Sequence, residues 1–271
     1  MKKLITACTT VLLLAGVSLN ASAEYQAQYW SFWDQSKNTL KTIDHSDWDS
    51  LLKNYVVTNH PSGINRFRYA DVSKSDRKKL DRYIDSLTST DPREYRKSVQ
   101  KAYWINLYNA VVVQQILKNY PVKSLAEVDK GGEKGPWDDT YIKVQGQKLS
   151  LNDIEHRILR PIWSDHKIHF ALTDGSLGSP NLQPTAYTSQ NMKPMLKQAG
   201  RDFINHPRGL TLEKNVMHCS KIFKDCRSDF CKSDKSLLKL FAHYAEDRKA
   251  LYLLGFQGEV QYQTDLALNA P

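Results

Sequence analysis

A long helical pattern in the middle of the chain limits the folds that this sequence can adopt. Between Arg93 and Tyr120, apolar residues recur three and four positions apart, as they do along one face of a helix. The pattern ends at Tyr120-Pro121, because proline cannot continue a helix and restricts the residue before it. Of the 271 residues, 41% are apolar and 25% are charged, which is typical of a globular protein. We therefore expect a folded, helix-rich chain.

Shorter patterns predict the other elements. Further helices are expected near residues 48–55, with Asp47 as a cap, over 75–87, from Ser150 to just before Pro161, and over 188–204 and 237–244. Strands are expected over 168–173 and 259–262, and a hairpin is expected where 141–144 and 147–149 flank Gln145-Gly146. We find no internal repeat and no linker. The predicted fold class is α+β, a single helix-rich domain with a small antiparallel or mixed sheet.

The first 23 residues have the features of a secretory signal peptide. A basic start, Met1 to Lys3, precedes an apolar run from Leu4 to Gly16 and a small-residue cleavage site, Ala21-Ser22-Ala23. Cys8 lies almost at the start of the chain, which argues against lipid attachment. No later stretch approaches the ~20 apolar residues that a membrane span needs. We expect cleavage after Ala23 and a periplasmic or secreted protein.

The basic charge of the chain does not indicate a nucleic-acid partner. There are 38 Lys and Arg residues against 29 Asp and Glu, a formal net charge of +9, which falls to +7 once Lys2 and Lys3 are removed with the signal peptide. The remaining basic residues are scattered among acidic ones, as on a solvated helix face. An exported protein also meets no genomic DNA. We expect no nucleic-acid partner.

Three cysteines, Cys219, Cys226 and Cys231, remain after the signal peptide. In an oxidising compartment we predict one disulfide and one spare thiol, without being able to name the pair. A zinc site formed by these three residues with His218 is the alternative, but its spacing is loose. The sequence contains no H-E-x-x-H, C-x-x-C, EF-hand, G-x-S-x-G, phosphate-loop or dinucleotide motif. We therefore expect no metal and no cofactor.

Polar residues that could carry chemistry gather around the predicted strand 168–173. His169 precedes the glycine- and serine-containing loop 174–180, where a general acid or base could approach a ligand closely. Asp174 and Ser176 of that loop are candidate partners. Glu155 and His156 lie on the preceding predicted helix. For His169 the alternative is a hydrogen-bonded core residue.

Further candidates are predicted to bind a ligand rather than to react. Asn106 and Asn109 share a helix face in a strongly apolar segment, and the alternative is that they tie neighbouring loops to their helix. Arg160 lies one turn beyond His156, where a surface Glu–His–Arg cluster is the alternative. Ser179 completes the set of predicted ligand-binding residues.

Several motifs in order along the chain resemble the DUF547 family. They are Lys101 to Ala110 (KAYWINLYNA), Leu149 to His156 (LSLNDIEH), Ile168 to Leu172 (IHFAL), Ser220 to Phe223 (SKIF) and Asp265 to Asn269 (DLALN). The resemblance implies one continuous domain over residues 48–271. The spacing of aromatic residues predicts a helical extension over 24–47 before it. It implies no established activity. The usual family pattern has cysteines where this chain has Asp174 and Ser179, so an inherited thiol activity is not expected.

These observations lead to three functional hypotheses. The first is a periplasmic pseudoenzyme that binds a small or peptide-like ligand around His169 without thiol chemistry. The second is a hydrolase or transferase that uses His169 as general base with Ser176 or Asp174. The third is an envelope protein-interaction module that docks a protein partner through N-terminal aromatic residues such as Trp30, Trp33 and Trp48.

Overall fold

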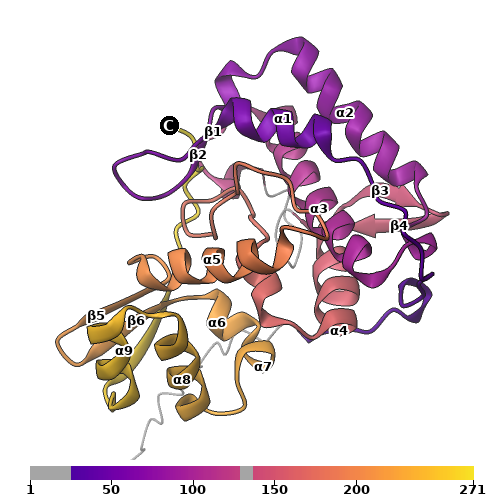
Figure 1. The fold of residues 1–271 in the computed structure, drawn as a ribbon. Coiled ribbons are helices and arrows are strands. Elements are labelled where there is room, and N and C mark those ends of the chain that lie inside the picture. Colours follow the sequence, from indigo (N-terminus) through magenta and orange to yellow (C-terminus); the bar gives the residue numbers. More distant parts are fainter. Residues whose placement is uncertain (1–25, 129–136) are drawn as a thin grey trace, which may run out of the picture.

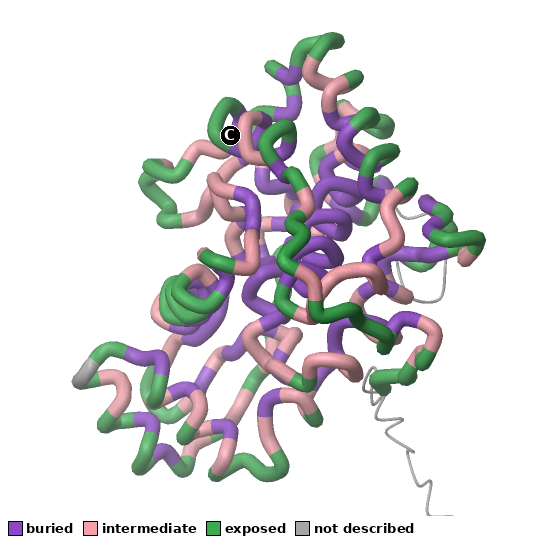
Figure 2. The backbone as a smooth tube through the Cα atoms, turned by 45° about the vertical axis from the view of Figure 1, so that its right-hand side comes forward, coloured by how far each residue is buried: buried purple, intermediate pink, exposed green. Residues whose placement is uncertain are grey.

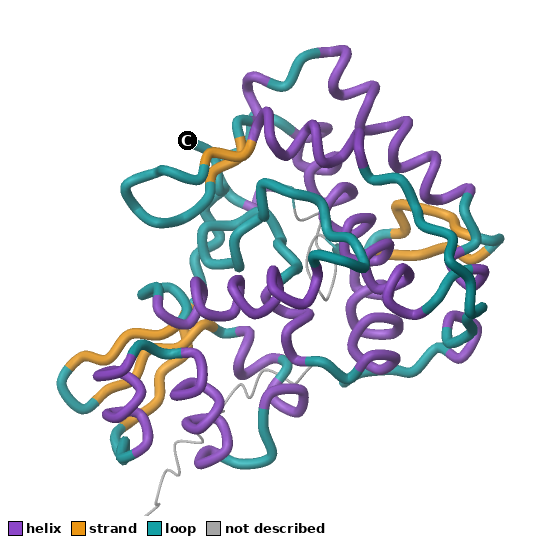
Figure 3. Tube along the Cα trace, in the orientation of Figure 1, coloured by secondary structure: helices purple, strands orange, loops and turns teal. Residues whose placement is uncertain are grey.

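The computed structural model describes residues 26–128 and 137–271, so the predicted signal peptide and the predicted loop 131–136 lie outside the described residues. The expected fold class is confirmed, because helices dominate and the sheets have two or three strands (Figures 1 and 3). The α-helices are α1 Ser46–Tyr55, α2 Lys74–Ser89, α3 Lys97–Asn119, α4 Arg160–Trp163, α5 Met192–Asn205, α6 Ile222–Asp225, α7 Arg227–Phe230, α8 Asp234–Tyr244 and α9 Asp247–Leu254. Within these described ranges, no helix combines the length and the apolar character that a bilayer crossing requires.

The strands form three small sheets. Their bounds are β1 Val56–Val57, β2 Arg66–Phe67, β3 Thr140–Val144, β4 Gln147–Ser150, β5 Leu210–Glu213, β6 Val216–Ser220 and β7 Glu259–Gln263. The predicted β3–β4 hairpin is confirmed, with Gln145 and Gly146 at positive φ values of 45° and 79° in the turn. In the largest sheet, β6 pairs antiparallel with β5 and parallel with β7, so the sheet is mixed.

Helix α3 runs through the middle of the first hydrophobic core. Almost every residue from Val99 to Leu117 is buried, which Figure 2 shows as a continuous purple helix. A helix that is apolar on every side is buried on every side. Trp33 packs edge-on against Trp104 with ring centroids 5.0 Å apart. Trp33 and Trp48 are 0% and 1% exposed, which counts against the N-terminal aromatics as a docking surface.

A second hydrophobic core lies beneath helices α5 and α8 and the three-stranded sheet. It is built largely from aromatic side chains, with Phe170, Phe203 and Phe223 among them. The C-terminal segment then returns to the first core, where the Leu268 amide donates to the carbonyl of Lys123 and the Asn269 amide to that of Gly175. The chain end therefore closes over the loop that follows His169.

The predicted strand over residues 168–173 is wrong. A 3₁₀ helix, His166–Phe170, occupies this segment, and the Asp165 carboxylate accepts a hydrogen bond from the Lys167 amide at its start. Ile168, His169 and Phe170 are all 0–1% exposed. Alternation of apolar and polar residues distinguishes two faces only when one of them meets water, and here neither does.

The predicted helix after Ser150 forms, but it does not stop before Pro161. Ser150 and Asp153 exchange the two hydrogen bonds of a capping box, each 3.0 Å long. A π-helix, Asp153–Leu159, follows and runs directly into α4, with Pro161 in its first turn. Pro161 has no amide hydrogen to donate to the preceding turn, and the continuous helix ends soon after it, at Trp163.

Buried His45 should make the stability of the fold depend on pH. Its Nδ1 lies 2.7 Å from the Tyr83 hydroxyl, and burial lowers its pKa from 6.5 to about 4. The unfolded chain therefore binds the proton more readily. The stabilisation is complete above pH 6.5 and is lost as the pH falls towards 4. When the pH is lowered from 7 to 4.5, the unfolding free energy of the wild type should fall by roughly 2–3 kcal/mol more than that of His45→Gln. Urea titrations at the two pH values measure this difference. A parallel fall in both proteins would contradict this.

Candidate functional site

A cleft opens where the two hydrophobic cores meet. Its volume is about 390 Å³, and its lining comes from α3, the π-helix, the loop after His169, the end of β6 and the C-terminal segment. Most of the exposed lining is apolar, and it includes Tyr108, Trp137, Leu172 and Leu266. A small number of polar groups converge on the apolar walls, which is the usual composition of a small-molecule site.

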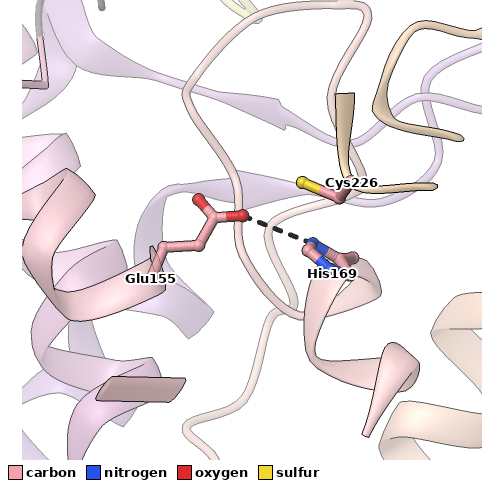
Figure 4. A group of neighbouring side chains, drawn as sticks. All are labelled: Glu155, His169 and Cys226. Atoms are coloured by element: carbon pink, nitrogen blue, oxygen red, sulfur yellow. Dashed lines mark ion pairs between the residues drawn. The ribbon is translucent and has the colours of Figure 1, made fainter. Parts of the chain in front are cut away.

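Three reactive side chains meet in this cleft. Glu155 comes from the π-helix, His169 from the 3₁₀ helix, and Cys226 from the junction of α6 and α7 (Figure 4). One carboxylate oxygen, one ring nitrogen and the sulfur all lie within 4.8 Å of one another. His169 Nδ1 is 3.3 Å from Glu155 Oε1. These are atom types that can bind a metal ion.

The other side of the His169 ring is fixed by a buried ion pair. His169 Nε2 lies 2.7 Å from Asp229 Oδ2. Arg160, whose side chain is 0% exposed, donates to both carboxylate oxygens of Asp229 at 2.5 and 3.2 Å. Arg160 Nη1 also lies 3.0 Å from His156 Nδ1. Fork-shaped pairing of this kind fixes orientation as well as charge, so the imidazole of His169 has one defined position.

The charges around His169 shift the pKa values of the whole group. Burial lowers the pKa of His169, but its interactions with Asp229 and Glu155 outweigh burial and raise it. Burial raises the pKa values of Glu155 and Asp229, but the neighbouring His and Arg cations lower each to about 2. The two carboxylates therefore favour the protonated form of His169.

Cys226 brings a thiol into a site that was expected to have none. The side chain is 3% exposed, and burial and the nearby Glu155 raise its pKa. Cys226 occupies neither position of the usual family cysteines, which are Asp174 and Ser179 in this chain. The two family positions thus remain without a thiol, and the thiol that Cys226 adds from elsewhere in the chain is held in its protonated form.

The predicted loop residues are divided between the cleft and the interior. Asp174 and Ser179 line the cleft. Burial raises the pKa of Asp174, whose Oδ1 accepts a hydrogen bond from the Ser176 amide at 2.7 Å. The Ser179 hydroxyl lies 2.8 Å from that of Thr173. Ser176 is 2% exposed and lies behind the cleft lining rather than in it.

Asn106 and Asn109 bind the backbone of neighbouring loops. The Asn106 amide group donates to the carbonyl of Tyr187 at 2.7 Å and accepts from the Tyr187 amide at 3.0 Å. Asn109 does the same for the chain after His169, with Ala171 as acceptor at 2.9 Å and Thr173 as donor at 3.1 Å. Both side chains stand outside the cleft lining. They hold the loops in place, as the alternative reading of this pair supposed.

Replacing Asn109 should therefore cost stability. Asn109→Ala leaves the Thr173 amide and the Ala171 carbonyl buried without a partner, and we expect a loss of about 2 kcal/mol in unfolding free energy. Asn119→Ala is the matched control, because Asn119 is an exposed residue of the same helix and should change stability by less than ~0.5 kcal/mol. Equal effects of the two changes in urea unfolding would contradict the assigned role.

Sequence reasoning missed Asp229 and misjudged Cys226. Cys219, Cys226 and Cys231 are all free thiols, so the structure does not support the predicted disulfide among them. Cys226 and Asp229 are three residues apart, close behind the SKIF motif, and the Asp229 amide donates to the Cys226 carbonyl at 3.0 Å. That spacing is the one local signal that a thiol and a carboxylate reach the same place.

Comparison with known proteins confirms the family resemblance over part of the chain. Residues 92–204 match the family model described as "Protein of unknown function, DUF547". The matched segment contains Glu155, Arg160 and His169, whereas Cys226 and Asp229 lie beyond it. No curated protein and no solved structure matches the chain.

Proposed function

We propose that this protein is a hydrolase that cleaves an ester or amide bond in a small or peptide-like substrate. The observation that carries the proposal is the meeting of Glu155, His169 and Cys226 in a cleft with mainly apolar walls. Ionisable groups with shifted pKa values in a concave site are the usual mark of catalysis. The apolar walls suit the side chains or acyl part of a substrate, and Asp174, Ser179 and Lys221 offer polar contacts beside them.

In this proposal each side chain around His169 either transfers a proton or positions the ring. At the cleft, the ionised Glu155 carboxylate accepts a proton from the attacking water, and the protonated His169 ring donates a proton to the leaving group. Asp229 and Arg160 are positioning residues, since they act on the substrate only through the ring of His169. Ser176, one of the two predicted helpers of His169, has no part in this mechanism because it lies behind the cleft lining.

Ligand binding without turnover is the second candidate function, and a specific observation favours it. His169 is only 1% exposed, which restricts direct contact between its ring and a substrate. Under this hypothesis the cleft is a binding pocket for the same class of ligand, and the charged group beneath it is a structural support.

A hydrolysis assay distinguishes the two functions. The purified wild type is tested on nitrophenyl esters of different acyl length and on dipeptide amides, beside His169→Gln and Glu155→Gln. We expect each change to reduce kcat/KM at least 100-fold, the lower end of the general acid–base contribution. His243→Gln and Glu213→Gln are the matched controls, because both residues are exposed. Both variants should retain wild-type activity. If the folded wild type hydrolyses neither substrate class, the hydrolase proposal is wrong and the binding function takes its place.

We also propose that the protein is exported, as its N-terminal segment predicts. The intact mass and N-terminal sequence of protein recovered from the periplasm test this, with Glu24 expected as the first residue. A product in the cytoplasm that still begins at Met1 would overturn it.

A further inference from the structure

We propose that Glu155, His169 and Cys226 bind one Zn²⁺ ion, with a carboxylate oxygen, an imidazole nitrogen and a thiolate sulfur as the three protein ligands. The fourth position then faces the cleft. Three protein ligands and one open position make up a catalytic zinc site. With the ion bound, the ion rather than the Glu155–His169 pair would activate the water. This catalytic use rests on the hydrolase proposed above, whereas the binding of the ion does not.

The distances fit a zinc ion with a small inward movement of the ligands. Bonds of about 2.0–2.3 Å in a tetrahedral arrangement place ligand atoms about 3.3–3.8 Å apart. Glu155 Oε1 and His169 Nδ1 are already 3.3 Å apart, and the Cys226 sulfur lies within 4.8 Å of a Glu155 carboxylate oxygen and a His169 ring nitrogen. Figure 4 shows the Cys226 sulfur, the Glu155 carboxylate and the His169 ring around one common space.

A buried ring nitrogen without a hydrogen bond points into this space. His169 is 1% exposed, and its Nδ1 makes no hydrogen bond of acceptable geometry in the part of the chain that the structure describes. Nε2 instead faces Asp229 at 2.7 Å, and because an ionised carboxylate only accepts, Nε2 carries a proton. When the ring is neutral, Nδ1 therefore presents a lone pair to the site.

The contacts behind His169 match those that support a metal-binding histidine. Such histidines donate their other ring N–H to a carboxylate or a carbonyl, which fixes the ring and raises its basicity. Asp229 is that carboxylate here, and Arg160 holds it through both oxygens. Asp229 thus orients one ring nitrogen of His169, while the other nitrogen faces Glu155 and the space shared with Cys226, as expected of a metal-binding histidine.

The charge and the atom types favour Zn²⁺ over other common divalent ions. With Cys226 as thiolate, three negative groups (Glu155, Asp229 and Cys226) face one cation, Arg160, so a dication balances the charge of the site. A sulfur ligand disfavours Mg²⁺ and Ca²⁺, which bind oxygen. On binding, the Cys226 thiol loses its proton to solvent and the sulfur bonds to the ion, and any proton on His169 Nδ1 leaves in the same way.

The site differs from the zinc alternative that the sequence allowed. That alternative combined His218, Cys219, Cys226 and Cys231. Among the described residues, one group of His, Cys and acidic side chains has ligand atoms close enough for a common ion, and Cys226 is its only member from that earlier set.

Zinc binding is tested on the full mature chain without reference to activity. The chain is stripped with a chelator and titrated with Zn²⁺ in competition with a coloured chelator, and native mass spectrometry gives the stoichiometry. We expect one Zn²⁺ per chain and at least 100-fold weaker binding in Cys226→Ser and in His169→Gln. Asp229→Asn removes only the support behind the ring and should weaken binding 10- to 100-fold. Co²⁺ in place of Zn²⁺ should give the near-ultraviolet band of a cobalt–thiolate bond, and Cys226→Ser should abolish it.

Two controls keep the test decisive. Cys231→Ser alters a thiol outside the group and should bind Zn²⁺ like the wild type. Circular dichroism of each metal-free variant separates loss of a ligand from loss of the fold. Weak binding by the wild type, or equal binding by the folded Cys226→Ser variant, overturns the zinc site. Zinc binding without turnover leaves the site standing and refutes the hydrolase, whereas turnover by the stripped enzyme refutes the role of zinc alone.

Discussion

Arg160→Met should destabilise the protein by about 3–5 kcal/mol. The Arg160 side chain is 0% exposed and pairs with both oxygens of Asp229. Methionine keeps the packing of the stem but removes the charge, so the Asp229 carboxylate remains largely buried with only His169 to compensate it. Breaking a buried ion pair from one side has this large cost because the remaining charge stays desolvated. Urea unfolding of the metal-free protein measures the loss.

A double-mutant cycle tests the explanation. Asp229→Asn removes the charge that Arg160→Met leaves behind, and its side-chain oxygen can still accept from His169. We expect the double variant to lose less stability than the sum of the two single changes. Lys53→Met is the exposed control, since the Lys53 side chain is 63% exposed and its pair with Asp49 should contribute less than ~1 kcal/mol. An Arg160 effect as small as that of Lys53 would contradict the argument.

The elements that sequence predicted best are those whose local pattern also decides their burial. The long helix α3 follows from its apolar spacing and from Pro121, and the β3–β4 hairpin follows from Gln145-Gly146. The segment 168–173 was not predictable in the same way. With Ile168, His169 and Phe170 all buried, tertiary packing rather than an inside-outside alternation sets its conformation.

The sequence predicted only part of the candidate site, again because tertiary packing brings the residues together. Glu155 and His169 belong to neighbouring motifs, and the sequence predicts both as candidate catalytic residues. Cys226 and Asp229 reach the same place only because the second core folds back against the first. The cysteine count instead predicts a disulfide, because cysteines of exported proteins commonly pair. No local sequence pattern predicts that the sulfur of Cys226, far along the chain, lies beside His169.

The second core should depend strongly on Phe170, the residue next to His169. Phe170 is 0% exposed, and its ring centroid lies 6.0 Å from those of Phe203 and Phe230 and 5.6 Å from that of Tyr244. Helix α5 approaches it so closely that a Cβ on Gly200 would lie 3.0 Å from the ring. Phe170→Ala therefore removes contacts on several sides and leaves a cavity. We expect a loss of about 3–5 kcal/mol, which corresponds to a decrease of roughly 10 °C in Tm.

Two further variants test whether the loss of stability in Phe170→Ala comes from the cavity. Phe170→Leu retains most of the buried volume and should cost less than Phe170→Ala, because the penalty grows with the cavity that remains. Leu254→Ala changes a residue that is 59% exposed and should shift stability by less than ~1 kcal/mol. Since Phe230 also packs on the His169 ring with centroids 4.9 Å apart, a relaxed second core should let that ring move. Weaker Zn²⁺ binding by folded Phe170→Ala, at a temperature well below its Tm, would then link the packing of this core to the geometry of the cleft. Unchanged stability in Phe170→Ala would show that the core closes around the cavity and that this link does not exist.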